Sequence, residues 1–373
     1  MDCRPFQDPH QVLRTSRRSC RFSLAAKGKS EFVWSSKPMD GNRVCMSALS
    51  LLVSVIFVPP ALRQESARQG STVLRERLTK IAASFPGKVG IFVRNIETGE
   101  ETGVNPNDEF PMASTYKVAI MVQVFREADA GHLSLAERVP LSDADRRLGS
   151  GLLPYMTPGL NPTIHDLVLL MITLSDNEAT DLMLKRVGAR NVTAMLRQLG
   201  IQDMRVDRST EELIGDWLAS ANPELRGVSG AELFAHPEKL ARLTRDQTEH
   251  ADRAFVDDAR DHTSPKAMAE LLTKIFRAEA ATEKSCHDML EIMEQQQLRT
   301  RIHRYLENTT VASKNGTIGY VTNDVGIVSV GKHHLVVSAY TLKANSNVTT
   351  EQAEELIGRL ARAAYSYFED TTR

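Results

Sequence analysis

Segments typical of β-strands lie near both ends of residues 71–373, and a long stretch of helical pattern separates them. Near the N-terminal end, "KVGIFVRNIETGEETGV" at 88–104 predicts two strands joined by a turn at "ETGE". Near the C-terminal end are three more β-rich runs, "NTTVASKNGTI", "DVGIVSVG" and "HHLVVSAYTLK". Because these strands have no other strands to pair with, we expect one antiparallel sheet built from both ends of this region.

The remaining segments show apolar residues at helical spacing. One precedes the first strand at 71–85, and another closes the chain at 350–368. Between the two groups of strands, the predicted helices are 114–130, 163–174, 176–187, 191–199, 265–278 and 282–297. The pattern favours an α+β fold, with an α/β lobe (71–112 and 299–373) and an inserted all-helical lobe (113–298). A cleft between lobes is a common place for a small-molecule site.

The charge balance narrows the kinds of partner. The formal net charge is -1, whereas nucleic-acid binding needs clustered positive charge, so we expect no nucleic-acid partner. The His residues show no metal-ligand spacing, and His333 and His334 fall on a β run where neighbours face opposite ways. We therefore expect no metal and no other cofactor, and we expect the protein to be a monomer.

Residues 1–70 differ from the rest, because a basic extension precedes an uncharged apolar run, "VCMSALSLLVSVIFV" at 44–58. A membrane-spanning helix needs roughly 20 such residues, and a shorter run after a basic residue resembles an export signal. We expect cleavage between 61 and 70, a periplasmic or secreted protein, and no stable membrane insertion afterwards. The alternative is an uncleaved membrane anchor. Cleavage would leave Cys286 as the only cysteine, which excludes an internal disulfide.

In "MASTYKVAI", a lysine stands in the first turn of a very apolar predicted helix, where the helix dipole disfavours a cation. Lys117 follows Ser114 by three residues, so the two share a helix face. Burial and the dipole both lower a lysine pKa, and a partly neutral lysine beside a hydroxyl is a general base beside a nucleophile. Alternatively, Ser114 is an ordinary N-cap.

Two further short motifs are ambiguous when each is taken alone. "SDN" at 175–177 separates two predicted helices, but Ser175 with Glu178 also fits a capping box. "KNG" at 314–316 ends a β run, and by itself it predicts only a strand end and a turn.

Together, the three motifs resemble the S-x-x-K, S-D-N and K-[TS]-G set of the active-site serine penicillin-recognising enzymes. Their order and spacing are similar to those of class A β-lactamases, and the resemblance covers most of residues 71–373. "DVGIVSV" resembles the strand after the K-T-G turn, and "ARDHTSPKAMAELL" at 259–272 resembles the segment that closes the Ω-loop. The resemblance implies a β-lactamase-like fold and a serine hydrolase that acts through an acyl-enzyme.

The resemblance also implies roles for the residues of the first two motifs. Ser114 would be the acylated nucleophile, and Lys117 its base or proton relay. Ser175 would pass a proton to the leaving nitrogen, and Asn177 would hydrogen-bond the substrate amide carbonyl.

The third motif would bind the rest of the substrate. Lys314 would attract the substrate carboxylate, and Asn315 replaces the usual Thr or Ser with an amide that can still donate a hydrogen bond. Gly316 completes the motif, and the backbone N–H groups of Ser114 and Thr317 would form an oxyanion hole.

The sequence departs from the family in the Ω-loop, where an E-x-x-L-N motif carries the Glu that positions the deacylating water. Asp207 and Arg208 match the start of the loop, but an ungapped alignment puts Thr210 at the Glu position. A shift by one residue would make Glu211 the deacylation base. The alternative is that Glu211 is a solvated acid at a helix start.

The loop between 207 and 261 is also much longer than in the family. Residues 216–258 look largely helical and polar, so this insertion would change access to the cleft. We expect Arg208 and Asp261 to form an ion pair that closes the neck of the loop.

The function that these observations favour is β-lactam hydrolysis of the class A type, weak if no carboxylate serves deacylation. One alternative is a D,D-peptidase or esterase of the same fold, acting on peptidoglycan-like substrates. Another is a non-catalytic cell-wall-binding protein that keeps the pocket, although the complete set of three motifs argues against it.

Overall fold

The computed structural model describes residues 60–157 and 159–371, all of which belong to one compact unit. The predicted export signal lies outside the described residues. Residues 60–70, assigned from sequence to the extension, begin helix α1 (Pro60–Ala82), which therefore starts earlier than the predicted residue 71. No helix among the described residues is both long and apolar enough to cross a bilayer.

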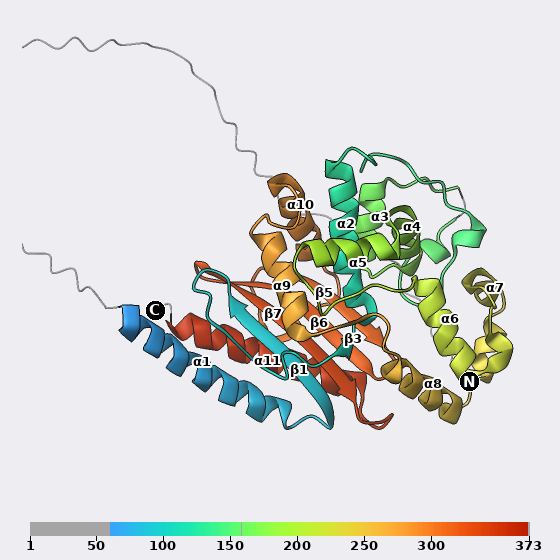
Figure 1. The fold of residues 1–373 in the computed structure, drawn as a ribbon. Coiled ribbons are helices and arrows are strands. Elements are labelled where there is room, and N and C mark those ends of the chain that lie inside the picture. The colour runs from blue at the N-terminus through green and yellow to red at the C-terminus, as the bar shows by residue number, and fades with distance from the viewer. Residues whose placement is uncertain (1–59, 158, 372–373) are drawn as a thin grey trace, which may run out of the picture. The chain divides into compact units, whose positions relative to one another are not determined.

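Five antiparallel strands form the main sheet, in the order β2-β1-β7-β6-β5 (Figure 1). Their bounds are β1 (Gly87–Asn95), β2 (Glu101–Val104), β5 (Val311–Ile318), β6 (Val321–Val330) and β7 (His333–Lys343). β1 pairs with β7 along its whole length, from Gly87 opposite Lys343 to Asn95 opposite Leu335. The predicted pairing of the two chain ends is confirmed, and β5, which carries the "KNG" motif, is an edge strand.

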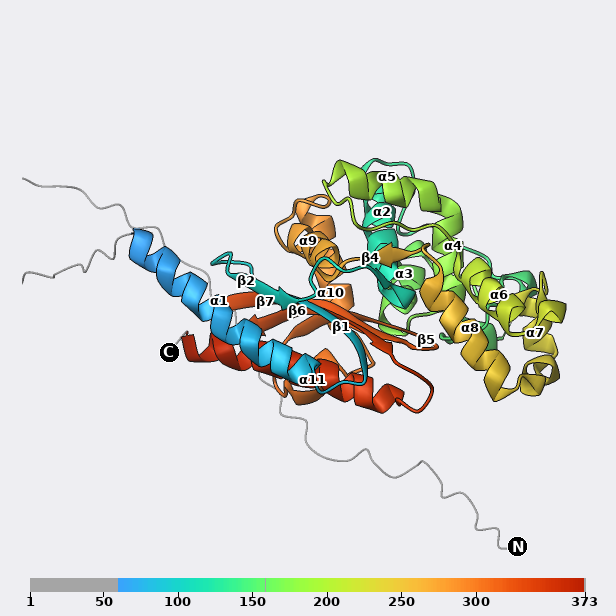
Figure 2. The same cartoon turned by 60° about the horizontal axis from the view of Figure 1, so that its bottom comes forward.

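Helices cover both faces of this sheet (Figure 2). α1 and α11 (Thr350–Thr371) lie together on one face, and α9 (Pro265–Phe276) packs against β1 and β7 from the other. The alternation of side chains along β1 allows both contacts. Ile91 and Val93 belong to the core beneath α1 and α11, whereas Phe92 belongs to the core shared with the remaining helices.

Helix α2 (Lys117–Asp129) is the central helix of the helical part, and every residue from Lys117 to Phe125 is buried. The helices that surround it are α3 (Ile164–Thr173), α4 (Asn177–Val187), α5 (Ala189–Gln198) and α10 (Glu283–Glu294). All helices predicted between the two groups of strands are therefore present. Because α9 packs on the sheet, the lobe boundaries at 113 and 298 stay a prediction.

The inserted loop is helical, as predicted. It contains α6 (Thr210–Ala221), α7 (Gly230–Ala235) and α8 (Arg245–Asp257), joined by 3-10 turns. α6 packs along α8, and Trp217 Nε1 donates a hydrogen bond across this contact to Asp252 Oδ1 at 2.9 Å. Leu213 and Phe255 pack on Ala113 at the start of the α2 segment, so the insertion lies against the motif that contains Ser114.

Two short strands that the sequence did not predict, β3 (Phe110–Pro111) and β4 (His262–Thr263), pair beside the neck of the insertion. Arg208 and Asp261 are almost fully buried there, and Arg208 Nε donates to Asp261 Oδ2 at 2.7 Å. The predicted ion pair is confirmed. Arg208 also binds Asp216 and Asp258, each at 2.9 Å, which links α6 and the end of α8 to the neck.

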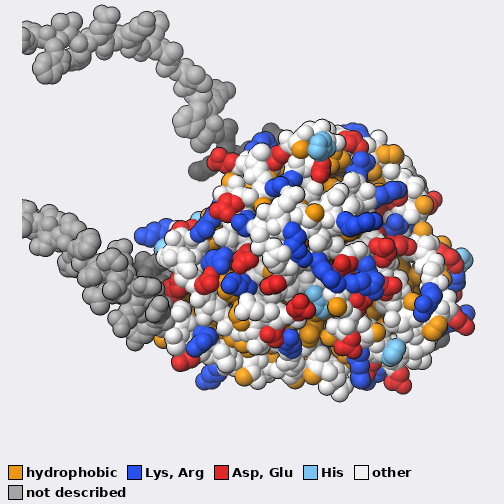
Figure 3. All heavy atoms as spheres, viewed as in Figure 1, with side chains coloured by type: hydrophobic (Ala, Val, Ile, Leu, Met, Phe, Trp, Pro, Cys, Tyr) orange, Lys and Arg blue, Asp and Glu red, His pale blue; other side chains and the backbone are white. Residues whose placement is uncertain are grey.

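On the face shown in Figure 3, the described side chains carry charges of both signs, and basic and acidic groups are intermixed over much of it. Charges arranged in this way partly neutralise one another, so this face offers no extended basic surface for a polyanion.

Candidate active site

Ser114 lies in a single 3-10 turn, Ala113–Tyr116, that leads directly into α2. The turn is entered through Ala113, whose φ of 46° is uncommon for a residue with a side chain. Neither the turn nor α2 has a side-chain capping hydrogen bond, so Ser114 does not act as an N-cap. Its side chain is partly exposed and borders a pocket, as a nucleophile requires.

The Lys117 side chain is fully buried, and its Nζ lies among three oxygen atoms. Nζ donates to the Ser175 carbonyl and to Asn177 Oδ1, both at 2.7 Å, and lies 3.2 Å from Ser175 Oγ. Burial lowers the pKa of Lys117 to about 7, although the charges of Asp176 and Asp181 act in the opposite direction. The predicted lowering of this pKa is confirmed, with burial as the main cause.

The structure brings Lys117 to Ser175 and Asn177, and among the described residues no hydrogen bond joins Lys117 Nζ to Ser114 Oγ. An ammonium has three N–H donors and no acceptor, and three acceptors surround this one. If Nζ loses a proton, the Ser175 hydroxyl can instead donate to Nζ across the same 3.2 Å. The geometry therefore provides a direct path for a proton between Lys117 and Ser175.

Ser175 stands at a sharp bend between α3 and α4, with a φ of 56°. Ser150 Oγ donates to the Ser175 carbonyl at 2.6 Å and so fixes the bend from the opposite side. The next residue, Asp176, is the N-cap of α4, and its carboxylate accepts hydrogen bonds from three backbone N–H groups. The capping box considered for Ser175 and Glu178 is not formed, and the Ser175 hydroxyl is left to Lys117.

The "KNG" motif lies on β5 where this strand crosses the start of the α2 segment. Gly316 allows the crossing, because a Cβ at this position would lie 2.8 Å from the Met112 carbonyl oxygen and 2.9 Å from Ser114 N. Lys314 is fully buried and donates to the Asn315 carbonyl at 2.7 Å. Burial, together with repulsion from Lys117, lowers the pKa of Lys314 well below its ordinary value.

Ser114 borders two adjoining pockets, of about 290 and 350 Å³, and both are also lined by Ser150 and Thr317. The second is lined by Ser175 and Asn315 as well. The first is lined by Asn177 and Thr210 and by the apolar side chains of Leu213, Ile214, Trp217 and Ile318. The motif residues predicted from sequence are therefore gathered around one cleft, with Lys117 and Lys314 buried beneath it.

Thr210, and not Glu211, borders the pocket that contains Ser114. The backbone N–H and the hydroxyl of Thr210 both donate to Asp181 Oδ1, at 2.7 and 2.6 Å. The Glu211 carboxylate instead accepts from Gly230 N at 2.7 Å and pairs with Arg147 Nε at 2.8 Å.

The reason is that α6 begins at Thr210, and successive side chains of a helix point about 100° apart. The ungapped alignment, with Thr210 at the Glu position, is the one that fits the structure. The role of deacylation base that we considered for Glu211 therefore has no support in this geometry.

Tyr116 is a site residue that the sequence analysis missed. It borders the same pocket as Ser114, it is 1% exposed, and its hydroxyl has no hydrogen-bond partner among the described residues. Burial and then the charge of Asp181 raise the pKa of Tyr116 well above its ordinary value, so the phenol stays neutral. In the sequence, Tyr116 falls in an apolar run beside Lys117. The pattern therefore gives no sign that its hydroxyl borders the pocket.

Arg301 was also missed, because it is one of several arginines in a polar stretch before β5. It is 2% exposed, and its guanidinium donates to the carbonyls of Gly316 and Asn323 at 3.0 and 2.7 Å. Nη2 donates to Thr317 Oγ1 at 2.5 Å and also pairs with Glu354 Oε1 at 3.2 Å, so Arg301 holds the residue that follows the "KNG" motif.

Within residues 60–157 and 159–371, no group of three or more His, Cys, Asp and Glu side chains could hold a metal ion. Cys286 is free and buried.

Comparison with known proteins extends these observations. The sequence profile described as "Beta-lactamase enzyme family" matches residues 73–368. Beta-lactamase PSE-4 of Pseudomonas aeruginosa is 23% identical over 332 residues, which cover 87% of this chain and 98% of that protein.

Solved structures show the same likeness. A beta-lactamase from Sphaerobacter thermophilus has a TM-score of 0.62 and 28% identity, over 79% of this chain and 95% of its own. The TLA-3 extended-spectrum beta-lactamase has a TM-score of 0.66 and 21% identity, over 80% of this chain and 99% of its own. The expected α+β fold, with its antiparallel sheet and helices, is confirmed by these structural matches.

Proposed function

The chain belongs to the beta-lactamase enzyme family, and we propose that it is a serine hydrolase that opens β-lactam rings through an acyl-enzyme on Ser114. The observation that carries the proposal is Lys117, a buried amine with a pKa of about 7 held against Ser175 and Asn177. A lysine with this pKa is partly neutral near neutral pH. Its neutral form can accept the proton of a hydroxyl on the same helix segment.

In the acylation step, Ser114 Oγ bonds to the lactam carbonyl carbon while its proton moves to Lys117, and the hydrogen bond between these two residues, which the free protein does not make, forms with the substrate bound. The carbon–nitrogen bond then breaks, and the leaving nitrogen receives a proton from Ser175. Lys117 restores the Ser175 proton across the 3.2 Å contact, so protons and electron pairs balance. The backbone N–H groups of Ser114 and Thr317 stabilise the oxyanion, since Gly316 lets β5 approach Ser114 N closely.

Substrate binding is assigned to the polar groups around this centre. Asn177 Nδ2 donates one N–H to the Leu148 carbonyl at 2.7 Å, which leaves its second N–H for the substrate amide carbonyl. Lys314, with Asn315 and Thr317, binds the substrate carboxylate, and Arg301, which is paired with Glu354, positions Thr317 through a hydrogen bond to its Oγ1. The carboxylate would favour the charged form of Lys314 and so reverse the effect of burial on its pKa.

Deacylation is the slow step in this proposal. It needs a base that activates a water, and the pocket offers the Thr210 hydroxyl, which is far too weak a base near neutral pH. Asp181 cannot replace it, because it borders neither pocket at Ser114 and its two oxygens already accept four hydrogen bonds, from Thr210, Arg147 and Glu211. The same observation supports the second candidate, a D,D-peptidase or esterase whose acyl-enzyme turns over slowly on β-lactams.

A fluorescent penicillin, followed on a denaturing gel over time, tests the proposal. We expect covalent label to appear rapidly and to clear slowly in the wild type, and we expect none in Ser114→Ala. Ser134→Ala is the matched control, because Ser134 is an exposed serine that borders neither of the two pockets and should leave the protein able to be labelled.

Label that never clears would support the peptidase or esterase. If the folded wild type is not labelled, β-lactams do not acylate Ser114. If it then binds penicillin without reacting, the result supports the non-catalytic binding protein. Undiminished hydrolysis by Ser114→Ala would remove the assignment of the nucleophile.

We further propose that the protein is exported to the periplasm or secreted and acts there as a monomer. The apolar run at 44–58 after a basic segment supports export. Mature protein purified from the extracytoplasmic fraction should begin between residues 61 and 70 by N-terminal sequencing and elute as a monomer.

A further inference from the structure

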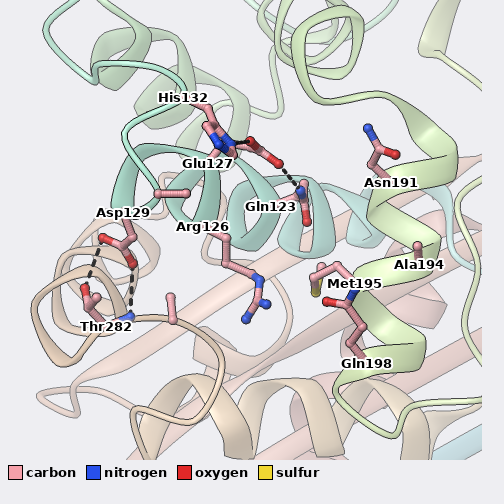
Figure 4. Close-up of a pocket in the computed structure, with 12 residues that line it drawn as sticks. Gln123, Arg126, Glu127, Asp129, His132, Asn191, Ala194, Met195, Gln198 and Thr282 are labelled. Carbon is pink, nitrogen blue, oxygen red and sulfur yellow. Dashed lines mark hydrogen bonds and ion pairs between the residues drawn. The ribbon is translucent and has the colours of Figure 1, made fainter.

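A separate pocket of about 640 Å³ lies between α2, α5 and the segment that leads into α10 (Figure 4). We name it the α2–α5 pocket, and its lining residues are Gln123, Arg126, Glu127, Asp129, Ala130, His132, Asn191, Ala194, Met195, Gln198, Ala281 and Thr282. None of these borders the two pockets at Ser114. Gln123 follows Ser114 by nine residues, or roughly 13 Å along the helix axis, so a molecule bound here would not contact Ser114.

Gln123 offers this pocket an unused hydrogen-bond acceptor. Its side chain is 7% exposed, and Nε2 donates to Glu127 Oε1 at 2.7 Å. Because a carboxylate oxygen can only accept, this bond fixes the orientation of the amide. The other amide atom, Oε1, is buried with no hydrogen-bond partner, and Figure 4 shows it on the side away from Glu127. A buried acceptor left without a donor is unfavourable, and a ligand N–H would satisfy it.

Arg126 lies on the same face of α2, three residues after Gln123, and supplies a positive charge. Its Nη1 donates to the Ala280 carbonyl at 2.9 Å, and no carboxylate within the described residues lies within ion-pair distance of its guanidinium. Figure 4 shows the guanidinium directed away from α2 toward the α10 side of the pocket. The charge of Asp129 interacts with Arg126 at longer range, but a half-buried guanidinium with no carboxylate in direct contact can still bind one.

The acidic side chains of the pocket are already engaged. Glu127 accepts from Gln123 and contacts His132 Nδ1 at 2.6 Å. Asp129 accepts from Thr282 N and Oγ1 at 3.0 and 3.1 Å and from Ser285 Oγ at 2.6 Å. Their charges still disfavour a simple anion, while Arg126 disfavours a simple cation. The complementary ligand therefore carries both charges, a donor for Gln123 and an anion for Arg126.

We propose that the α2–α5 pocket binds a free α-amino acid or short zwitterionic peptide. The ligand carboxylate pairs with Arg126, and its ammonium donates to Gln123 Oε1 beside the charge of Glu127. Side chains three residues apart on a helix are roughly 5–6 Å apart at Cβ, which suits groups separated by one or a few bonds. Met195 and the neighbouring alanines leave room for a small apolar side chain. This inference does not depend on the activity at Ser114.

Isothermal titration calorimetry with alanine and with alanyl-alanine tests the proposal. Two matched ligands separate the charges, since N-acetylalanine lacks the ammonium and alanine amide lacks the carboxylate. We expect saturable binding of alanine or its dipeptide and at least about tenfold weaker binding of both matched ligands. If neither alanine nor alanyl-alanine binds at concentrations up to about 20 mM, the proposal is overturned.

Variants locate the bound ligand. Gln123→Met keeps the length of the side chain and removes the acceptor, and Arg126→Met removes the charge, so each should weaken binding about tenfold or more. Arg253→Met is the control, because Arg253 is an exposed arginine on α8. Circular dichroism checks folding, and if Gln123→Met does not fold, Arg126→Met decides the test.

Amide chemical shifts provide a readout that is independent of catalysis. They should change along α2 and α5 when the ligand is added. Equal affinities in wild type and both variants would overturn the proposal, as would shifts confined to residues around Ser114.

Discussion

Two buried lysines, Lys117 and Lys314, lie beside the cleft that contains Ser114. Each is deprived of water by burial, and the positive charge of Lys117 further lowers the pKa of Lys314. A substrate carboxylate beside Lys314 would favour its ammonium form, and that charge would in turn keep Lys117 neutral. In this way, binding of the correct anion would prepare the base for acylation. This effect of the charge of one lysine on the pKa of the other is strong only if both are buried, and both side chains are fully buried.

The first prediction concerns the pH dependence of acylation. With a pKa of about 7, Lys117 is increasingly protonated as the pH falls below that value, and only its neutral form can accept a proton. The second-order rate constant for acylation, which reports the free enzyme, should therefore fall about tenfold per pH unit below 7. Rates of penicillin labelling between pH 5 and 9 would show this limb. Lys117→Ala should slow acylation by about 10²–10⁴-fold and abolish the limb. An unchanged profile in the variant would assign the limb to another group.

The second prediction concerns the missing deacylation base. Thr210→Glu would place a carboxylate at the pocket, but it would also replace a hydroxyl that donates to Asp181 with a second negative charge. Like charges in one buried site raise a carboxyl pKa, so the single variant should gain little activity. Thr210→Glu combined with Asp181→Asn removes the repulsion and should clear the acyl group about 10²-fold faster or more. Single-turnover loss of label measures this, and equal rates in all three proteins would show that deacylation is limited elsewhere.

The three motifs predicted from sequence lie around one cleft, whereas the sequence left two registers open at the start of α6, one with Thr210 and one with Glu211 at the Glu position. Ser114, Ser175 and Lys314 stand in three motifs that are far apart in the sequence and that the fold brings together at one cleft. The choice between Thr210 and Glu211 depended on which residue begins α6, and sequence patterns place helix boundaries least reliably. The polar atoms of Tyr116 and Arg301 stand at the ends of long, buried side chains, and no local sequence pattern shows where such atoms lie.

At the scale of elements, a buried arginine lies at the centre of the bonds that hold the insertion to the neck, beside hydrogen bonds between Asp207 and Asp261. Arg208 binds three carboxylates, of Asp216, Asp258 and Asp261, and two of its bonds reach residues at the far end of the loop. Hydrogen bonds to these carboxylates raise the pKa of Arg208 in spite of its burial. One side chain thus joins the middle of α6, the end of α8 and the residue before β4.

The third prediction follows from this cluster. Arg208→Met keeps most of the side-chain volume but leaves Asp261, which is 2% exposed, as a buried charge without its partner. Breaking a buried pair in this way costs about 3–5 kcal/mol of unfolding free energy. Arg260→Met is the control, since Arg260 binds Asp216 and Asp258 from an exposed position and should cost about 1 kcal/mol or less. Urea denaturation of the three proteins measures both effects, and similar stabilities of the two variants would show that the neck does not depend on burial.

Prediction of elements succeeded where hydrophobic periodicity is strong. Each predicted helix and strand is present, because long amphipathic or β-rich runs depend little on distant contacts. β3 and β4 were missed because two-residue strands carry no periodicity and form only when the neck brings Phe110 opposite Thr263. The sequence also could not predict that α9 packs on the sheet, because its apolar face does not show which lobe the helix contacts.

For the molecule as a whole, the insertion converts a surface loop into a wall of the active-site cleft. Trp217 and Ile214 from α6 face Ile318 from the end of β5 across the pocket that contains Ser114. Trp217 also joins α6 to α8, because its Nε1 donates a hydrogen bond to Asp252 Oδ1 at 2.9 Å. Gly319 fits beneath this bond, since a Cβ there would lie 2.1 Å from Asp252 Oδ1. The wall and the bond that supports it are therefore parts of one contact, although they can be separated by substitution.

The last prediction uses this separation. Trp217→Ala removes both the wall and the bond, so β-lactams with bulky acyl side chains should acylate Ser114 faster relative to compounds without one. Trp217→Phe keeps an aromatic wall and loses only the hydrogen bond to Asp252. It should therefore preserve the wild-type preference while losing about 1 kcal/mol of unfolding free energy. The measurement is the ratio of acylation rate constants for benzylpenicillin and 6-aminopenicillanic acid, which differ only in the acyl group. If Trp217→Ala leaves this ratio unchanged, the insertion does not select the acyl group. If Trp217→Phe shifts the ratio as far as Trp217→Ala does, the bond to Asp252 rather than the indole surface determines the shape of the cleft.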